Sequence, residues 1–147
     1  MTPVVLACLV LVVSTTLLHY EALRLLTAVL PRLCIVPRAR LVVVMLASFA
    51  AHALEIMLYA LAIYALARAA SCGTLGTAGA PGWTTTLYFS AETYTSLGYG
   101  DIVPHGALRA LSGVEALNGL LLIGWTASYT YVAMQGLWGG AVAAADR

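Results

Sequence analysis

Three long apolar stretches dominate the pattern of hydrophobic and polar positions along the chain. They cover about residues 3–30, 41–67 and 107–134, the first becoming less purely apolar after residue 18. Each reaches the roughly 20 residues that a helix needs to cross the hydrocarbon core of a bilayer. In lipid such a segment has to be helical, because only a helix satisfies its own backbone polar groups there. The pattern therefore predicts three membrane-spanning helices.

The composition changes between the first two stretches. His19, Glu21 and Arg24 interrupt the apolar run, and Pro31 and Pro37 then break the helical pattern. The segment is either the end of the first helix, bending into the membrane interface, or a short amphipathic helix that lies on the membrane. The pattern leaves both possibilities open.

A short polar segment lies between the second and third stretches. It follows a loop rich in glycine and small residues over 69–82, and threonine hydroxyls are available to cap its start after Trp83. The part from Thr84 to Tyr94 is too short and too polar to cross a bilayer. It fits a re-entrant helix, which is tolerated only where protein shields it from lipid.

The composition favours a membrane protein and argues against several other classes. Of the 147 residues, 62% are hydrophobic and only 9% are charged, whereas a soluble domain carries about 25% charged residues. The net charge of +1 argues against a nucleic-acid partner, which needs a basic surface. There is no nucleophile–base motif, no glycine-rich phosphate loop and no ligand cluster at metal spacing, so we expect neither an enzyme nor a bound cofactor.

The arginines are unevenly placed around the second stretch. Those that precede it are Arg24, Arg32, Arg38 and Arg40. Only Arg68 and Arg109 lie on the other side of it, at the end of the second stretch and at the start of the third. Positive residues accumulate in cytoplasmic loops, so we expect an outside N-terminus and a cytoplasmic C-terminus, in a multi-pass protein of the plasma (inner) membrane. The loop with the re-entrant helix then opens to the outside.

The segment directly after the re-entrant helix carries the most specific chemistry in the chain. It consists of Thr95, Ser96, Leu97, Gly98, Tyr99, Gly100 and Asp101. A cation path must replace the hydration shell of the ion, and successive backbone carbonyls aimed at one axis can do this. Such a backbone needs unusual angles, which glycine at alternate positions permits. We expect the carbonyls that face the ion to be those of Ser96, Leu97, Gly98 and Tyr99, with the Ser96 hydroxyl completing the innermost site.

The stretch from Tyr88 to Asp101 resembles the pore domain of tetrameric potassium channels. The resemblance covers roughly residues 41–135 and is greatest to small bacterial channels of the two-span type, here with an extra N-terminal helix. It implies an all-α membrane protein that passes potassium ions passively as a homotetramer in lipid, with potassium bound by the filter carbonyls. The parts it implies are an N-terminal helix and connector over 1–36 and a pore domain over 37–147, with outer helix 41–68, pore helix 83–95, filter 95–101 and inner helix 107–135.

Residues around the filter fit a supporting shell. The resemblance implies that Glu92 pairs with Asp101 behind the filter, where two close buried carboxyl groups would share a proton. Tyr88 is placed to hydrogen-bond Asp101, and Thr93 is placed to hydrogen-bond the Tyr99 hydroxyl.

Three positions depart from the family pattern. Ser96 replaces the usual threonine, Leu97 the commoner valine, and Phe89 a tryptophan that would hydrogen-bond the filter tyrosine. We expect these changes to affect conductance and filter stability more than ion identity.

The third span should line the ion path. The resemblance places Gly119 as a hinge of the inner helix. Helical spacing then predicts that the cavity or its gate is lined by Leu120, Ile123, Ala127 and Tyr131. The alternative is that Gly119 and Gly124 only permit close helix packing.

Ionisable side chains within the spans are costly and usually functional. His52 and Glu55 share a face of the second span, and Glu115 and Asn118 share a face of the third. They form either a network behind the filter that tunes gating or senses pH, or a hydrogen-bonded cluster that only sets helix register. We expect no metal site at His52, because no His/Cys/Asp cluster at ligand spacing surrounds it.

Two other functions are compatible with the sequence. A weakly selective cation channel would differ at the filter, and the intact Gly-Tyr-Gly-Asp over 98–101 argues against it. A non-conducting or accessory protein with a pore-like fold stays open because of Ser96 and Leu97. The gating stimulus stays open as well, since a voltage sensor needs several regularly spaced arginines and the first span carries only Arg24.

Overall fold

The described part of the chain is entirely helical apart from its loops. The computed structural model describes residues 2–68, 72–76 and 80–145, so parts of the predicted loop over 69–82 lie outside the description. The side chains of Pro37 and of residues 137–145 lie outside it as well. The elements are α1 (Thr2–Val29), the 3₁₀ turn η1 (Leu30–Arg32), α2 (Pro37–Arg68), α3 (Trp83–Tyr94) and α4 (Leu108–Ala145). The segments long and apolar enough to span a membrane are Thr2–Arg32, Arg38–Arg68 and Leu108–Gly136. The predicted all-α membrane fold with three spans is confirmed.

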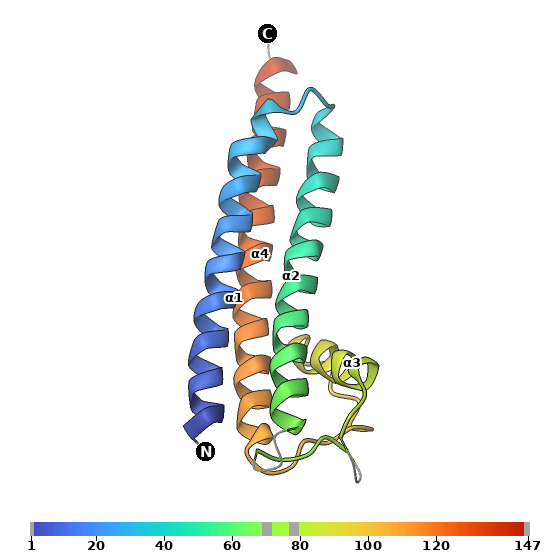
Figure 1. Cartoon of the computed structure of the whole chain (residues 1–147). Helices are drawn as coiled ribbons and strands as arrows, with labels where there is room; N and C mark the ends of the chain where they lie inside the picture. The colour runs from blue at the N-terminus through green and yellow to red at the C-terminus, as the bar shows by residue number, and fades with distance from the viewer. Residues whose placement is uncertain (1, 69–71, 77–79, 146–147) are drawn as a thin grey trace.

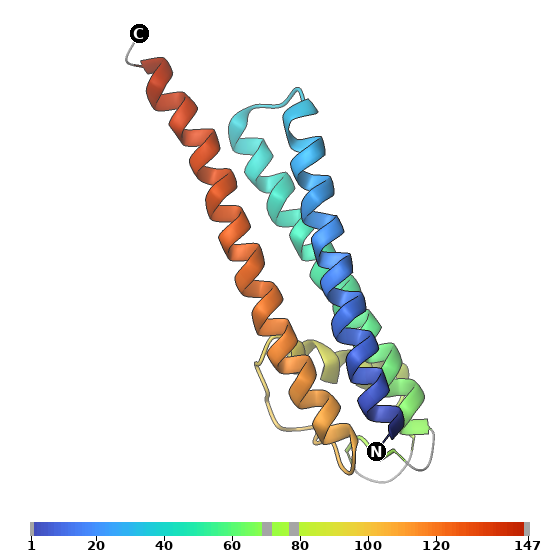
Figure 2. The same cartoon turned by 90° about the vertical axis from the view of Figure 1, so that its left-hand side faces the viewer.

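The three long helices lie side by side, and the short helix α3 lies across one end of them (Figures 1 and 2). Helix α1 packs against both α2 and α4, and α3 packs against α2 and α4. The N-terminus of α1 and helix α3 are at the same end of the bundle, whereas the C-terminus is at the other end. The N-terminus and the loop between α2 and α4 therefore lie at the same end of the bundle.

The segment between the first two spans contains no separate amphipathic helix. Helix α1 continues unbroken to Val29, one 3₁₀ turn follows, and α2 begins at Pro37. Proline is well tolerated at the start of a helix, where its missing N–H would have no partner. Glu21 and Arg24 lie within α1 and form an exposed ion pair of 3.0 Å. Of the two possibilities, the polar residues thus belong to the end of the first helix.

The helix bounds differ from the predicted ones mainly at the ends away from α3. Helix α2 begins at Pro37 rather than at residue 41, and α4 continues to Ala145 rather than ending at residue 135. Apolar periodicity locates a span but not the turns that extend it beyond the hydrocarbon core.

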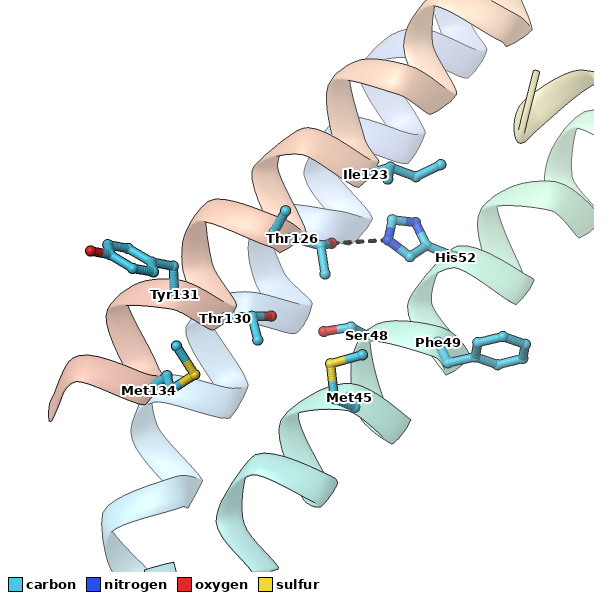
Figure 3. A pocket seen from close by; sticks show the side chains of 10 residues that line it. Met45, Ser48, Phe49, His52, Ile123, Thr126, Thr130, Tyr131 and Met134 are labelled. Atoms are coloured by element: carbon cyan, nitrogen blue, oxygen red, sulfur yellow. Dashed lines mark hydrogen bonds between the residues drawn. The ribbon is translucent and has the colours of Figure 1, made fainter. Parts of the chain in front are cut away.

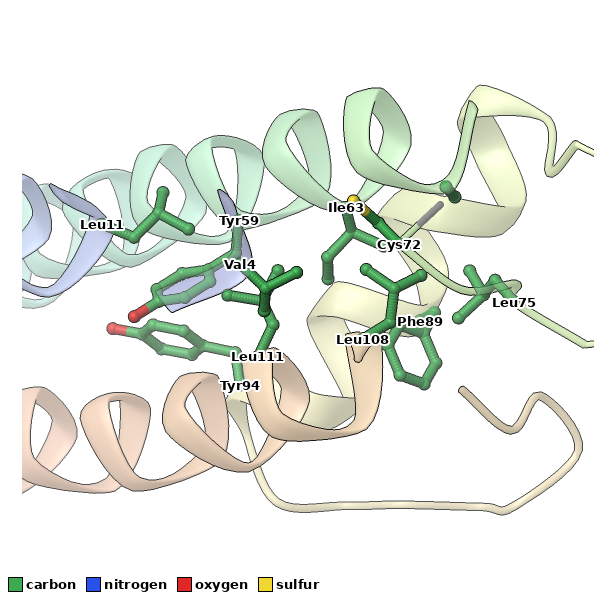
Figure 4. Close-up of a cluster of buried hydrophobic side chains, with 11 residues drawn as sticks. Val4, Leu11, Tyr59, Ile63, Cys72, Leu75, Phe89, Tyr94, Leu108 and Leu111 are labelled. Carbon is green, nitrogen blue, oxygen red and sulfur yellow. The ribbon is translucent and has the colours of Figure 1, made fainter. Parts of the chain in front are cut away.

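A cluster of buried hydrophobic side chains joins all four helices at the end that carries α3 (Figure 4). Its members are Val4 and Leu11 of α1, Tyr59, Ile63 and Ala67 of α2, Phe89 and Tyr94 of α3, Leu108 and Leu111 of α4, and Cys72 and Leu75 of the loop. Large apolar side chains elsewhere stay uncovered, with Phe49 76% and Val132 66% exposed. Such surface would be a liability in water but suits contact with lipid or with other copies of the chain.

The loop before α3 pairs with the segment that leads into α4. Gly76 N donates to Val103 O at 2.9 Å, and His105 N donates to Thr74 O at 2.8 Å. Gly73 has φ +123°, and a Cβ there would lie 2.1 Å from the carbonyl oxygen of His105. This pairing anchors both ends of the segment over 83–101 to the same place.

Candidate functional site

Residues 95–101 follow α3 as an irregular segment, called the strand below, with a regular alternation in its backbone angles. Helix α3 ends at Tyr94, and φ is then positive at Ser96 (58°), Gly98 (56°) and Gly100 (79°), that is, at every second residue. Ser96 is the one non-glycine residue with positive φ in the described chain. A non-glycine residue pays about 1–2 kcal/mol for left-handed angles, so the surrounding structure has to hold Ser96 in place. The glycine spacing in the sequence pointed to two of these positions but not to Ser96.

The backbone N–H groups of this strand point back towards α3. Leu97 N and Gly98 N donate to Glu92 O at 2.9 and 3.3 Å, and Tyr99 N donates to Glu92 Oε2 at 3.2 Å. Among the hydrogen bonds of the described residues, none uses the carbonyl oxygens of residues 96–99. A strand with its donors engaged on one side and its carbonyls free can present those carbonyls to a cation.

The residues around the strand form part of the expected shell. The Tyr88 hydroxyl donates to Asp101 Oδ2 at 3.2 Å, as the sequence predicted. Partial burial and the hydrogen bond to Asp101 raise the pKa of Tyr88, so the phenol keeps the proton that it donates. Phe89 is buried in the hydrophobic cluster and makes no polar tie to the strand.

Two expected contacts are absent from the described residues. Glu92 does not pair with Asp101: its carboxyl group accepts from Tyr99 N, while Asp101 accepts from Tyr88 and from the N–H of Ile102. Each carboxyl group thus has its own donor, which removes the need for a shared proton. No hydrogen bond joins Thr93 to the Tyr99 hydroxyl, because the Tyr99 side chain is turned outward and is 68% exposed.

Gly119 lies where α4 meets the end of α3. A Cβ at Gly119 would be 2.1 Å from the carbonyl oxygen of Tyr94, and α4 is continuous through this position. The contact favours the packing explanation for Gly119 over the hinge. Gly124 has no atom within 4 Å of its notional Cβ, so close packing within the chain does not account for it.

The four predicted lining residues lie on an uncovered face of α4. Leu120 is 54%, Ile123 36% and Tyr131 56% exposed, and Ala127 is exposed as well. Ile123, Ala127 and Tyr131 also border a pocket of about 490 Å³ between α4 and α2 (Figure 3). These side chains are therefore available to line a path or to meet another copy of the chain.

The four intramembrane polar residues do not form one network. His52 and Glu55 are paired as expected, with His52 Nδ1 3.0 Å from Glu55 Oε2. Asn118 instead donates to Thr15 Oγ1 of α1 at 2.7 Å and to the Tyr59 hydroxyl at 3.1 Å. Glu115 pairs with Ser90 of α3. Residues that share a helix face thus reach different neighbours, because each faces a different helix of the bundle.

Glu115 lies in a buried pair whose hydrogen bonds indicate where a proton sits. The Ser90 hydroxyl is 2.9 Å from Ile56 O and is also hydrogen-bonded to Glu115 Oε1. One hydroxyl proton serves one acceptor. Both contacts are complete when Ser90 donates to Ile56 and a protonated Glu115 donates to Ser90. The pair can therefore be accommodated in the bundle without a buried negative charge.

His19 was missed as a site residue, and it changes the surroundings of His52. His19 Nδ1 lies 2.9 Å from Glu55 Oε1, and both side chains are fully buried. The expectation that no ligand cluster surrounds His52 is wrong, because donor atoms of His19, His52 and Glu55 all lie within 4.8 Å of one another. The available signal was an ionisable residue inside the first span, but only the packing of α1 on α2 shows what it faces.

Tyr94 and Thr126 complete this cluster from the other two helices. The Tyr94 hydroxyl donates to Glu55 Oε2 and lies 2.9 Å from His52 Nδ1. Thr126 Oγ1 lies 2.9 Å from His52 Nε2 and 3.2 Å from His19 Nε2. We refer to His19, His52, Glu55, Tyr94 and Thr126 as the polar cluster.

The comparisons with known proteins gave one match. A family model described as "Ion channel" matches residues 41–135, from α2 through α3 and the strand to α4. No curated protein matches the chain, and no solved structure matches it.

Proposed function

The chain belongs to the ion-channel family, and on that basis we propose that it is one subunit of a potassium-selective channel built from four copies of itself. The observation that carries the proposal is the strand over 95–101, with positive φ at every second residue and its N–H groups held by Glu92. Its carbonyls at Ser96, Leu97, Gly98 and Tyr99 would replace the hydration shell of potassium ions. Flow would be passive, as membership of a channel family implies.

The need for further copies follows from how little of the strand one chain covers. Leu97 and Tyr99 are 57% and 68% exposed, although both side chains are large and apolar or aromatic. A single strand supplies one wall of an ion path, and rings of carbonyls in this kind of filter come from four chains. In the proposed tetramer the neighbouring copies cover these side chains and the exposed face of α4.

The proposed setting is the plasma (inner) membrane, with the filter end outside. Helices α1, α2 and α4 supply the spans, and the arginine-rich segment between α1 and α2 lies at the end opposite to α3. Positive residues favour the cytoplasmic side. The filter would then be entered from outside, and the α4 C-terminus would be cytoplasmic.

The test is ion flux through the purified full-length chain in liposomes and planar bilayers. We expect a barium-sensitive flux, a reversal potential that follows the potassium gradient, and a particle of four chains in native mass spectrometry. Equal permeability to potassium and sodium would replace the proposal with a weakly selective cation channel. Absence of barium-sensitive flux from a folded tetramer would favour a non-conducting protein.

A further inference from the structure

Four side-chain donor atoms converge inside the bundle, from α1, α2 and α3. His19 Nδ1 is 2.9 Å from one oxygen of Glu55, and His52 Nδ1 is 3.0 Å from the other. The Tyr94 hydroxyl is 2.9 Å from His52 Nδ1 and hydrogen-bonded to Glu55. The two imidazole rings are 5.2 Å apart between centroids, so both can turn an edge to a common centre.

We propose that His19, His52, Glu55 and Tyr94 form a binding site for a divalent transition metal ion, with Zn²⁺ as the best fit. Imidazole nitrogens and carboxylate or phenolate oxygens are ligands that Zn²⁺ accepts in tetrahedral sites. Bond lengths of about 2.0–2.2 Å place tetrahedral donors about 3.3 Å apart. The hydrogen-bonded pairs are now 2.9 and 3.0 Å apart, and the donor atoms of His19, His52 and Glu55 all lie within 4.8 Å of one another, so side-chain rotation would have to bring the four donors to that spacing around the ion.

Thr126 supplies the hydrogen-bond acceptor that a metal-binding histidine needs at its other ring nitrogen. The Nε2 atoms of both histidines point to the same Thr126 oxygen, at 2.9 and 3.2 Å. When both Nδ1 atoms bind metal, both Nε2 atoms carry hydrogen and become donors. A hydroxyl oxygen has two acceptor positions, so Thr126 can receive both bonds and hold both rings in the metal-binding tautomer.

The charges balance in this arrangement. Glu55, His19 and Tyr94 are fully buried, where a net charge is costly. One Zn²⁺ with two neutral histidines, the Glu55 carboxylate and a Tyr94 phenolate has no net charge. Starting from the neutral phenol, the ion displaces one proton from Tyr94 to solvent, while the histidine protons move to Nε2.

The pocket between α2 and α4 provides a route to the site. His52 and Thr126 belong to its lining, and Figure 3 shows them facing each other across it. The His52 side chain is 17% exposed, whereas that of His19 is not exposed. An ion in the pocket therefore meets His52 first, and the remaining ligands lie behind it.

The site lies next to the strand without being part of it. Tyr94 is the last residue of α3, directly before Thr95, and its backbone packs on Gly119 of α4. A bound ion would tie the end of α3 to α1 and α2 at a point that each chain forms alone. The metal site does not depend on whether the chain conducts.

The experiment measures zinc on the full-length chain in detergent, after removal of metal with a chelator. We expect about one Zn²⁺ per chain by elemental analysis, a raised melting temperature on zinc addition, and a Co²⁺ derivative with the visible spectrum of a tetrahedral site. His19→Gln and Glu55→Gln should abolish these signals, and Tyr94→Phe, which keeps the ring, should weaken them. Thr126→Val should lower affinity about 10–100-fold.

His105→Gln is the matched control, because His105 is exposed and lies outside the cluster. The proposal is overturned if His105→Gln loses zinc as His19→Gln does, or if Tyr94→Phe and Thr126→Val are folded and bind zinc like the unchanged chain. It is also overturned if pH alters the stability of the chain through His19 while zinc has no effect, since the cluster then binds only protons.

Discussion

The strand over 95–101 and the polar cluster meet at Tyr94 but are built in opposite ways. The strand is held to its own chain by backbone hydrogen bonds to α3, and its large side chains Leu97 and Tyr99 are exposed. The polar cluster draws side chains from all four helices and is almost completely buried. In a single chain one region leaves large side chains uncovered, whereas the other is complete. Changes in the strand should alter conduction first, and changes at buried contacts should alter stability first.

The largest effect is expected at Gly98, which has φ +56°. Gly98→Ala costs about 1–2 kcal/mol per subunit through left-handed strain, and this cost recurs in each of the proposed four copies. We expect potassium flux to fall to background, together with a fall of a few degrees in the melting temperature of the detergent-solubilised chain. Gly113→Ala is the control, since a Cβ there meets nothing within 4 Å. Normal flux in Gly98→Ala would contradict the view that conduction depends on the backbone angles of the strand.

Gly119→Ala should disturb both regions. The added Cβ would lie 2.1 Å from Tyr94 O, so α4 or the end of α3 has to move. Overpacking of this kind costs about 1–3 kcal/mol, and we expect a lower melting temperature together with reduced flux. Gly113→Ala again provides the reference. An unchanged melting temperature with altered opening would instead support a hinge at Gly119.

Asn118→Leu tests the contacts among α1, α2 and α4 alone. The substitution removes hydrogen bonds to Thr15 and Tyr59, and such bonds between membrane helices contribute about 0.6 kcal/mol each, with a maximum of about 1.7. We expect a loss of about 1–2 kcal/mol in reversible unfolding, with ion selectivity unchanged. Arg24→Gln, at the exposed pair with Glu21, should cost no more than about 1 kcal/mol. A change in selectivity would show that the two regions are coupled.

Glu115→Gln should have a smaller effect, because glutamine can donate to Ser90 as a protonated carboxyl group does. We expect stability within about 1 kcal/mol of the unchanged chain, and the same response of current to pH. Glu115→Ala leaves the Ser90 contact empty and should be clearly less stable. A pH response that disappears in Glu115→Gln would instead identify Glu115 as a sensor.

Tyr88→Phe should have the smallest effect, since it removes one exposed hydrogen bond to Asp101. The raised pKa of Tyr88 means that the folded chain holds the phenol proton more tightly than the unfolded chain. The stability that this bond adds is fully present below the ordinary tyrosine pKa of about 10 and is lost as pH rises through the higher folded value. Melting curves of both proteins from pH 7 to 11 should therefore converge at the alkaline end.

Much of the strand could be predicted because its chemistry is local. The glycine spacing at Gly98 and Gly100 and the helix before it are contiguous in sequence, and Tyr88 reaches Asp101 within the same segment. The pairing of Glu92 with Tyr99 N rather than with Asp101 could not be predicted. The choice between two nearby partners depends on differences in angle and distance that residue order does not encode.

By itself the sequence determined the three spans, the position of the short helix α3 and the strand that follows it. These features depend on the length of each apolar stretch, on the need to hydrogen-bond every backbone polar group in lipid, and on the backbone angles that glycine can adopt. All three act over neighbouring residues. Only the tertiary structure decided which residues meet across helices. His19 contacts Glu55, Asn118 donates to Thr15 and does not contact Glu115, and Gly119 packs against the last residue of α3. In lipid the helices are apolar on all sides, so hydrophobicity does not select the contact face; close packing and buried hydrogen bonds select it.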